Sequence, residues 1–238
     1  MKLACASGSF HRDIERGDLT QLEFLDLCAR ELACDGVVLD VRHFPRIDDD
    51  YLAQIKKMGA DRGLSIAALA DAAFFTATRD RMEHVITLAL ALGAPLIASP
   101  LARETEMSWS EQLARLGTAT SLAKARNVTL ALRNAASTFA ATTHDCKRVA
   151  KETDSAWLRF GPEPSRLDAA SDPGLLATNS VLLWSDVADE SERSIAQTLA
   201  LYGAFRGYLA IDESSGVATA AGVAASIAAW RTAILNRI

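Results

Sequence analysis

The 238-residue chain lacks several patterns that would assign it to a specialised class of protein. No apolar run reaches the length of a membrane-spanning helix, and the residues after Met1 become polar too soon for a signal peptide. The four cysteines include no Cys-x-x-Cys pair, so neither a zinc ribbon nor a disulfide framework is indicated. We therefore expect a cytoplasmic protein in which Cys28 and Cys34 are buried free thiols.

Two further absences exclude classes of fold and of binding partner. No Gly-x-Gly-x-x-Gly turn follows the first apolar segment, which argues against a dinucleotide-binding fold. The formal net charge of −5 provides no basic surface for nucleic acid or for an anionic membrane. We expect a small molecule as the partner, with no nucleic acid and no membrane.

Short apolar segments alternate with amphipathic ones along the whole chain. The segments expected as strands are 3–7, 36–41, 64–69, 95–101, 127–134, 157–160, 180–184 and 207–211. Between them, Thr20 with Glu23 and Thr142 with Asp145 have the spacing of helix-capping boxes. Eight strand–helix units of about thirty residues predict a single (β/α)8 TIM barrel over residues 1–238. An open doubly wound sheet is the main alternative.

In such a barrel the active site lies at the carboxyl ends of the strands, so polar residues there are functional candidates. Arg133 is the most unusual, because a guanidinium at the end of a buried strand is either paired with acids or bound to an anion. Alternation predicts that Arg133 and Asp212 face the interior, whereas Asn134 turns toward the rim. Trp184 and the pair Phe74-Phe75 are expected in the core, although the phenylalanines can also hold a sugar face or a homodimer partner.

Other strand-end residues have two interpretations each. Asp40 is the best candidate for a general base, but pairing with Arg42 or Arg159 explains it equally well. His11 and His43 titrate near neutrality and can act as acids or bases, although a single loop histidine is more often a rim residue. With Arg133 and Arg166, the arginines at strand ends would make the mouth cationic and suit a phosphorylated or carboxylated sugar.

Four segments carry a resemblance to a known family. They read Asp-Gly-Val-Val-Leu-Asp at 35–40, Ala-Leu-Ala-Leu-Gly-Ala-Pro-Leu-Ile at 89–97, Val-Thr-Leu-Ala-Leu-Arg-Asn at 128–134 and Gly-Tyr-Leu-Ala-Ile-Asp at 207–212. Their order and spacing over the full length resemble the xylose-isomerase-like barrels, a family of sugar isomerases and epimerases. The resemblance implies that a divalent metal (Mn, Mg or Zn), held by four strand-end ligands, assists proton transfer beside a carbonyl.

The ligand positions that the resemblance implies are poorly kept in this chain. They fall on Arg133, on Glu163 with Arg166 where a histidine is expected, on Leu183 and on Asp212. Arginine cannot ligate a metal, and it would repel a divalent ion about 5 Å away by roughly 7 kcal/mol at an effective dielectric of about 20. We therefore expect no metal cofactor and an Arg133 bridged by Glu163 and Asp212, which are the two ligands that remain if a metal does bind.

Two functional hypotheses follow. The first is a sugar or sugar-acid isomerase or epimerase that works without metal. Its catalytic residues would be Asp40, His43, Glu163 and Asp212, and its substrate-binding residues His11, Arg42, Arg133, Asn134, Arg159 and Arg166. The second is a noncatalytic barrel that binds a small carbohydrate or a partner protein. Both hypotheses are compatible with a homodimer.

Overall fold

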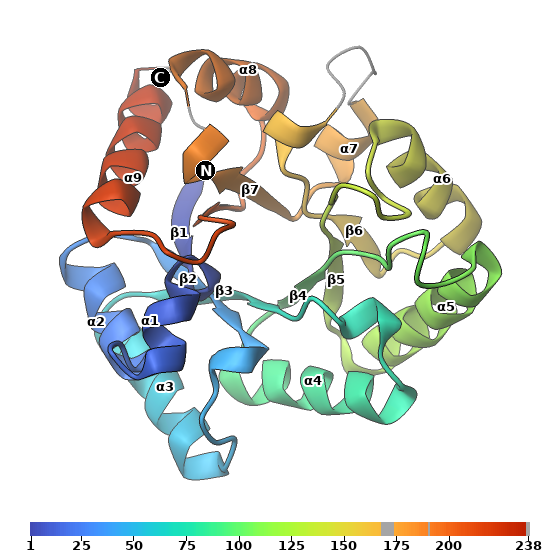
Figure 1. Ribbon diagram of the computed structural model, residues 1–238, viewed down its shortest axis with the longest axis horizontal. Helices are drawn as coiled ribbons and strands as arrows, with labels where there is room; N and C mark the ends of the chain where they lie inside the picture. Colours follow the sequence, from blue (N-terminus) through green and yellow to red (C-terminus); the bar gives the residue numbers. More distant parts are fainter. Residues whose placement is uncertain (168–173, 190, 237–238) are drawn as a thin grey trace.

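The computed structural model describes residues 1–167, 174–189 and 191–236. Eight strands alternate with helices, and the helices surround the strands (Figure 1). The strands are β1 (Lys2–Ala6), β2 (Gly36–Asp40), β3 (Ser65–Ala70), β4 (Leu96–Ser99), β5 (Thr129–Leu132), β6 (Leu158–Phe160), β7 (Leu182–Asp186) and β8 (Tyr208–Asp212). The predicted (β/α)8 barrel is confirmed.

All ladders of the sheet are parallel, in the order β6-β5-β4-β3-β2-β1-β8-β7. The two outer strands of this order are joined by a parallel bridge between Phe160 and Ser180. The amide of Val181 donates to the Phe160 carbonyl at 2.9 Å, and that of Trp184 donates to the Pro162 carbonyl at 2.9 Å. These bonds close the barrel and bring the loops after β5, β6, β7 and β8 to one edge.

The helices are α1 (His11–Arg16), α2 (Gln21–Arg30), α3 (Asp49–Asp61), α4 (Arg79–Leu92), α5 (Trp109–Arg126), α6 (Thr143–Thr153), α7 (Gly174–Asn179), α8 (Glu192–Tyr202) and α9 (Ala220–Leu235). Both predicted capping boxes form, at Thr20 with Glu23 and at Thr142 with Asp145. Single 3-10 turns follow several strands: η1 (Ser7–Phe10), η2 (Val41–His43), η3 (Phe74–Thr76), η4 (Pro164–Arg166) and η5 (Val187–Asp189).

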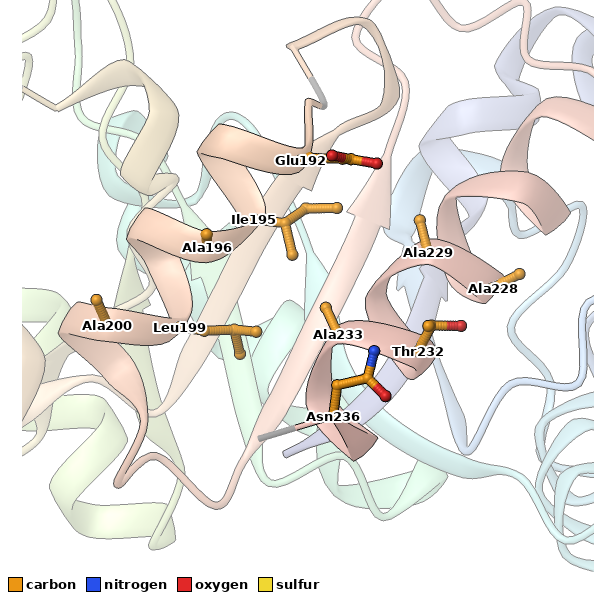
Figure 2. Close-up of a pocket in the computed structure, with 10 residues that line it drawn as sticks. All are labelled: Glu192, Ile195, Ala196, Leu199, Ala200, Ala228, Ala229, Thr232, Ala233 and Asn236. Carbon is orange, nitrogen blue, oxygen red and sulfur yellow. The ribbon is translucent and has the colours of Figure 1, made fainter. Parts of the chain in front are cut away.

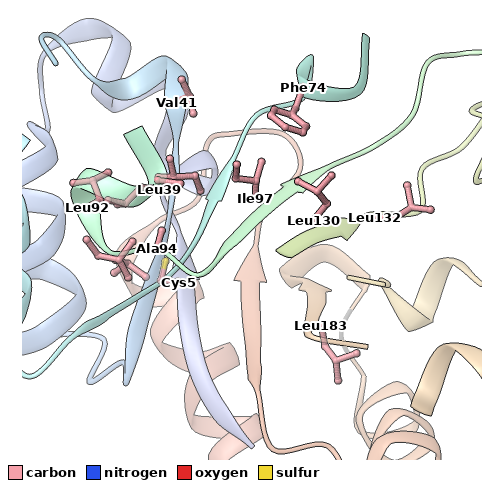
Figure 3. Close-up of a cluster of buried hydrophobic side chains, with 14 of the residues drawn as sticks. Cys5, Leu39, Val41, Phe74, Leu92, Ala94, Ile97, Leu130, Leu132 and Leu183 are labelled. Carbon is pink, nitrogen blue, oxygen red and sulfur yellow. The ribbon is translucent and has the colours of Figure 1, made fainter. Parts of the chain in front are cut away.

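The two faces of the sheet carry side chains of different size. Large residues such as Leu39, Ile97 and Leu130 fill the layer between the strands and the helices (Figure 3). Small residues dominate the inner face of the barrel, among them Ala4, Ala6, Ala68, Ala98, Ala131 and Ala210. Because methyl groups do not fill the barrel axis, the inner face leaves room at the carboxyl end of the strands.

Several local predictions need correction. Strand β7 extends to Asp186 rather than ending at Trp184, and α1 forms between β1 and the helix capped by Thr20, where no element was predicted. Strand β4 covers Leu96–Ser99 only, because the prolines on either side of it have no N–H for the ladder. Phe74 and Phe75 are fully buried, so they contact neither a sugar nor a partner chain.

The remaining expectations concern thiols and membranes. All four cysteines are buried free thiols, as expected for Cys28 and Cys34. In the described part of the chain, no helix is both long and apolar enough to cross a bilayer.

Candidate active site

A cavity of about 510 Å³ opens at the carboxyl ends of the strands. Its apolar lining includes Ala6 and Ala98 of the inner face, together with Val38, Pro100 and Trp184. The charged residues that line it are Asp40, Arg42, Arg103, Arg133, Arg166, Asp212 and Glu213. We call it the mouth cavity.

Arg133 extends inward from the end of β5, as the alternation of β5 predicts. Its Nη1 donates to Asp212 Oδ2 at 2.8 Å and its Nη2 donates to Glu163 Oε2 at 3.0 Å, so the predicted bridge is present. The guanidinium carbon also lies 4.1 Å from the centre of the Trp184 ring, a cation–π contact. Burial acts to lower the pKa of Arg133, but attraction to Asp212 and Glu163 outweighs it and raises that pKa.

A second arginine extends this arrangement. Arg166 Nε lies 2.6 Å from Glu163 Oε1, and Arg166 Nη2 donates to Asp186 Oδ2 at 2.6 Å. Glu163 is 0 % exposed, and this burial raises its pKa while the guanidinium of Arg133 acts against the rise. Three acids and two arginines thus alternate across the ends of β5 to β8. We call these residues the Arg133 network: Asp212, Arg133, Glu163, Arg166 and Asp186.

Asn134 does not turn toward the rim as predicted. Its side chain is 2 % exposed, and its Oδ1 accepts a hydrogen bond from the Glu163 amide at 2.7 Å. Strand pairing already ends at Leu132, so the alternation of a strand no longer sets the direction of the Asn134 side chain. Asn134 therefore fixes the backbone that carries Glu163.

Asp212 is the acid of the Arg133 network that lines the mouth cavity. Its Oδ2 is bound to Arg133, whereas the described contact of its Oδ1 is a long hydrogen bond of 3.5 Å from Ser9 Oγ. Ser9 Oγ in turn accepts from the Glu213 amide at 2.9 Å. One oxygen of Asp212 is thus oriented by a cation while the other is weakly bound.

Asp40 also lines the mouth cavity, and its partner is Arg42. Arg42 Nε lies 3.1 and 3.2 Å from the two carboxylate oxygens, and Nη2 donates to Oδ2 at 2.7 Å. The Arg42 amide donates to Oδ1 at 2.9 Å as well. The hydrogen bonds to Asp40 raise the pKa of Arg42. Of the two pairings left open by the sequence, the structure contains the one with Arg42.

The two candidate histidines contact each other beside the mouth cavity without lining it. His43 Nδ1 lies 2.8 Å from Ser7 Oγ, His43 Nε2 lies 2.9 Å from His11 Nδ1, and His11 Nε2 lies 3.3 Å from Glu15. Ser7 Oγ also accepts from the Asp40 amide at 2.9 Å. Burial lowers the pKa of His43. We call Ser7, His43, His11 and Glu15 the histidine chain.

Two predicted positions lie elsewhere. Arg159 does not line the mouth cavity; its Nη1 donates to Asn179, the last residue of α7, at 2.9 Å. Leu183 is fully buried in the outer core, so it cannot stand for an inward-facing ligand (Figure 3). The inner face of β7 is instead formed by Trp184 and Asp186, since side chains alternate along a strand.

Two residues of the site, Asp186 and Arg103, were missed by the sequence reasoning. Asp186 lies beyond the strand expected over 180–184, and Arg103 follows β4 in a loop. Trp184 is in the core as expected, at 2 % exposure, and it also packs on Arg133 in the cavity wall. The signal for Trp184 and Asp186 was their two-residue spacing at the end of β7.

The divalent metal that the resemblance implies does not fit this donor set. Where the ion would lie, the guanidinium of Arg133 already joins Asp212 to Glu163. Within the described ranges, no three His, Cys, Asp or Glu side chains form a group suited to a metal ion. A fixed cation in direct contact with both acids would oppose the ion electrostatically.

A second groove lies outside the barrel, between α8 and α9 (Figure 2). It is lined largely by apolar side chains, including Ile195, Leu199 and Ala233. It contains no counterpart of the Arg133 network, and only Glu192 among its lining residues is charged. The mouth cavity is therefore the candidate active site.

Comparisons with known proteins agree with this geometry. The family model described as xylose isomerase-like TIM barrel matches residues 28–189, more than half of the chain. No curated protein has a significantly similar sequence. Among solved structures, D-psicose 3-epimerase from Clostridium cellulolyticum H10 has 13% identity and a TM-score of 0.78, covering 98% of this chain and 99% of that one.

Two further structures have the same fold. The probable 3-DHS dehydratase AsbF from Bacillus anthracis has 13% identity and a TM-score of 0.77, with coverage of 96% of this chain and 98% of that chain. An L-ribulose 3-epimerase has 16% identity and a TM-score of 0.72, with coverage of 99% and 96%. At such identities, the likeness establishes the fold alone.

Proposed function

Because this chain belongs to the xylose isomerase-like TIM barrel family, we propose that it is an isomerase or epimerase acting on a small sugar or sugar derivative. The proposed reaction moves a proton on a carbon next to a carbonyl group. Two solved structures of the same fold carry the names of sugar epimerases, which supports this reaction class.

The observation that carries the proposal is the position of Arg133 in the cavity wall between two acids. A guanidinium has five N–H donors, and the described hydrogen bonds of Arg133 use one on Nη1 and one on Nη2. The side chain is 20 % exposed, so donors remain for a substrate oxygen. Negative charge that develops on the carbonyl oxygen is stabilised by these donors, whose position is fixed before the substrate enters.

Asp212 is the base in this proposal. Its Oδ1 takes the proton from the carbon next to the carbonyl, while Arg133 holds Oδ2. In an isomerisation the same carboxyl returns the proton to the neighbouring carbon, and the hydroxyl proton moves to the former carbonyl oxygen. Glu163 is fully buried beside Arg133 and Arg166, so we assign it to positioning Arg133 rather than to proton transfer.

We propose that the reaction uses no resident divalent metal. Asp40 provides a second carboxylate in the cavity wall, but both of its oxygens are bound by Arg42. His43 lies behind that wall and is assigned to the histidine chain. The substrate is therefore polarised and deprotonated from the side of the Arg133 network.

The test is exchange of carbon-bound hydrogen with solvent. Ketoses and keto acids are incubated with the protein in D₂O, and deuterium beside the carbonyl is measured by NMR. We expect exchange with the wild type, its loss in Asp212→Asn, and a large decrease in Arg133→Lys, which keeps the charge but not the planar donors. A matched control is Arg126→Lys, an exposed position at the end of α5. Exchange that is unchanged in Asp212→Asn contradicts the assignment.

A noncatalytic carbohydrate-binding barrel is the second candidate. The observation in its favour is that the three acids considered for catalysis, Asp40, Glu163 and Asp212, are all paired with arginines. Stabilisation of the fold by a sugar, with no deuterium incorporation across the same panel, would support this alternative.

A further inference from the structure

Arg103 lies in the loop between β4 and α5, and its side chain lines the mouth cavity. The loop is tied to the segment after β5 on both sides of Arg103. The amide of Phe139 donates to the Ala102 carbonyl and that of Glu104 donates to the Ser137 carbonyl, each at 3.2 Å. Ser137 has φ 62°, a left-handed conformation that non-glycine residues rarely adopt. Such strain clusters at ligand-binding loops, and here it accompanies a fixed backbone beneath Arg103.

Arg103 differs from the other arginines of the mouth cavity in its partners. Arg42, Arg133 and Arg166 have carboxylate oxygens at 2.7, 2.8 and 2.6 Å, respectively. The side chain of Arg103 makes no ion pair and no hydrogen bond with any residue that the structure describes. Arg103 is exposed, so its five N–H donors are accessible to a ligand from solution.

We propose that Arg103 binds an acidic group of the substrate, a carboxylate or a phosphate, while the carbonyl end of the same molecule lies at Arg133. The inference rests on the proposed function and names its substrate class as a sugar acid or sugar phosphate. A cavity of about 510 Å³ is of the size that holds a small-molecule ligand. A guanidinium donates two parallel N–H bonds to a carboxylate or phosphate, which a neutral hydroxyl cannot accept in the same way.

Binding of three matched compounds tests the inference: fructose, fructuronate and fructose phosphate. Isothermal titration is carried out on the wild type, Arg103→Gln and Arg103→Lys. We expect the wild type to bind one acidic compound at least about tenfold more tightly than fructose, and Arg103→Gln to lower that preference by about ten- to a hundredfold. Arg103→Lys keeps the charge without the paired donors, so its preference should fall between the two. Which acidic compound binds more tightly decides between carboxylate and phosphate.

The matched control is Arg126→Gln, which removes the same charge from an exposed position at the end of α5. The inference is overturned by failure of both acidic compounds to bind, by a preference unchanged in Arg103→Gln, or by an equal loss in Arg126→Gln. Deuterium exchange in the same samples separates the two proposals. If deuterium exchange occurs but the acidic compounds bind no more tightly than fructose, this inference alone is overturned. If the acidic compounds bind more tightly through Arg103 but no exchange occurs, only the proposed reaction is overturned.

Discussion

Two connected sets of polar side chains lie on the carboxyl edge of the barrel, and they differ in the charge of their members. The Arg133 network joins the ends of β5 to β8 with arginines and carboxylates. The histidine chain joins the loops after β1 and β2 through a hydroxyl and two imidazoles that are neutral in part of the accessible pH range. The first set faces the mouth cavity and the second lies behind its wall.

The two sets on this edge should respond differently to changes in pH. A guanidinium stays charged at every pH that the protein tolerates, so the two cations of the Arg133 network keep their charge whatever the pH. Burial lowers the pKa of His43, so acidification changes the charge of the histidine chain while the guanidinium groups stay charged.

The largest expected effect comes from removing the shared cation. Arg133→Met leaves Glu163 and Asp212 as buried acids without that partner, and we expect a loss of about 3–5 kcal/mol in the free energy of unfolding. Urea denaturation measures the loss. Arg126→Met, at an exposed site, should cost less than about 0.5 kcal/mol. Equal losses in the two variants would show that the network is not a stabilising unit.

A smaller effect is expected at Asn134. Asn134→Ala leaves the buried amide of Glu163 without its acceptor, which should cost about 1–3 kcal/mol in the free energy of unfolding. The same variant should decrease deuterium exchange, because Glu163 no longer holds Arg133 in place. If Asn134→Ala lowers the free energy of unfolding but keeps the full rate of deuterium exchange, then Asn134 stabilises the fold without being needed to position Arg133.

The histidine chain should respond to pH. Burial lowers the pKa of His43 in the folded protein, so the unfolded chain takes up this proton at a higher pH than the native state does. The stabilisation is therefore fully present above pH of about 6.5 and is lost as pH falls toward the pKa of the folded state. Groups that face His43 are Asp40 and Glu15, which act to raise its pKa, and His11 and Arg42, which act to lower it.

His43→Gln tests this assignment by thermal unfolding across the acidic range. We expect the midpoint of the wild type to fall below pH of about 6.5 more steeply than that of the variant, because the variant has no proton to take up at this site. If the unfolding midpoints of the two proteins change with pH in parallel, the histidine chain does not contribute to the pH dependence of stability.

The smallest expected effect concerns metals. Addition of Mn²⁺, Mg²⁺ or Zn²⁺ should leave the unfolding midpoint and the exchange rate unchanged, since Arg133 lies between the two acids that would ligate the ion. Calorimetric titration that detects tight binding at a site lost in Asp212→Asn would contradict the proposed metal-free reaction.

The sequence predicted the architecture well because each signal for it is local. Alternating strand and helix patterns predicted the barrel, and the spacing of Thr20 to Glu23 predicted a capped helix. The bridge of Arg133 was predicted from the ligand positions that the family resemblance implies, where an arginine stands with two acids.

Other parts of the site depend on contacts that no local pattern encodes. Arg159 pairs with Ala131, two residues before Arg133, so it lies below the strand ends and reaches Asn179 instead of the mouth cavity. Residues 11 and 43 meet because β1 and β2 are neighbours in the sheet, and sequence alone indicated only that each follows a strand. The direction of Asn134 was wrong because the strand had already ended.

The alanines on the inner face determine how this protein can change. Apart from glycine, every substitution at Ala6 or Ala98, which line the mouth cavity, adds volume. Each added group would make the mouth cavity shallower and would leave the arginines and acids at the edge of the cavity unchanged. The depth of the mouth cavity and the charge of its edge thus depend on different residues, so selection can change one while the other stays constant.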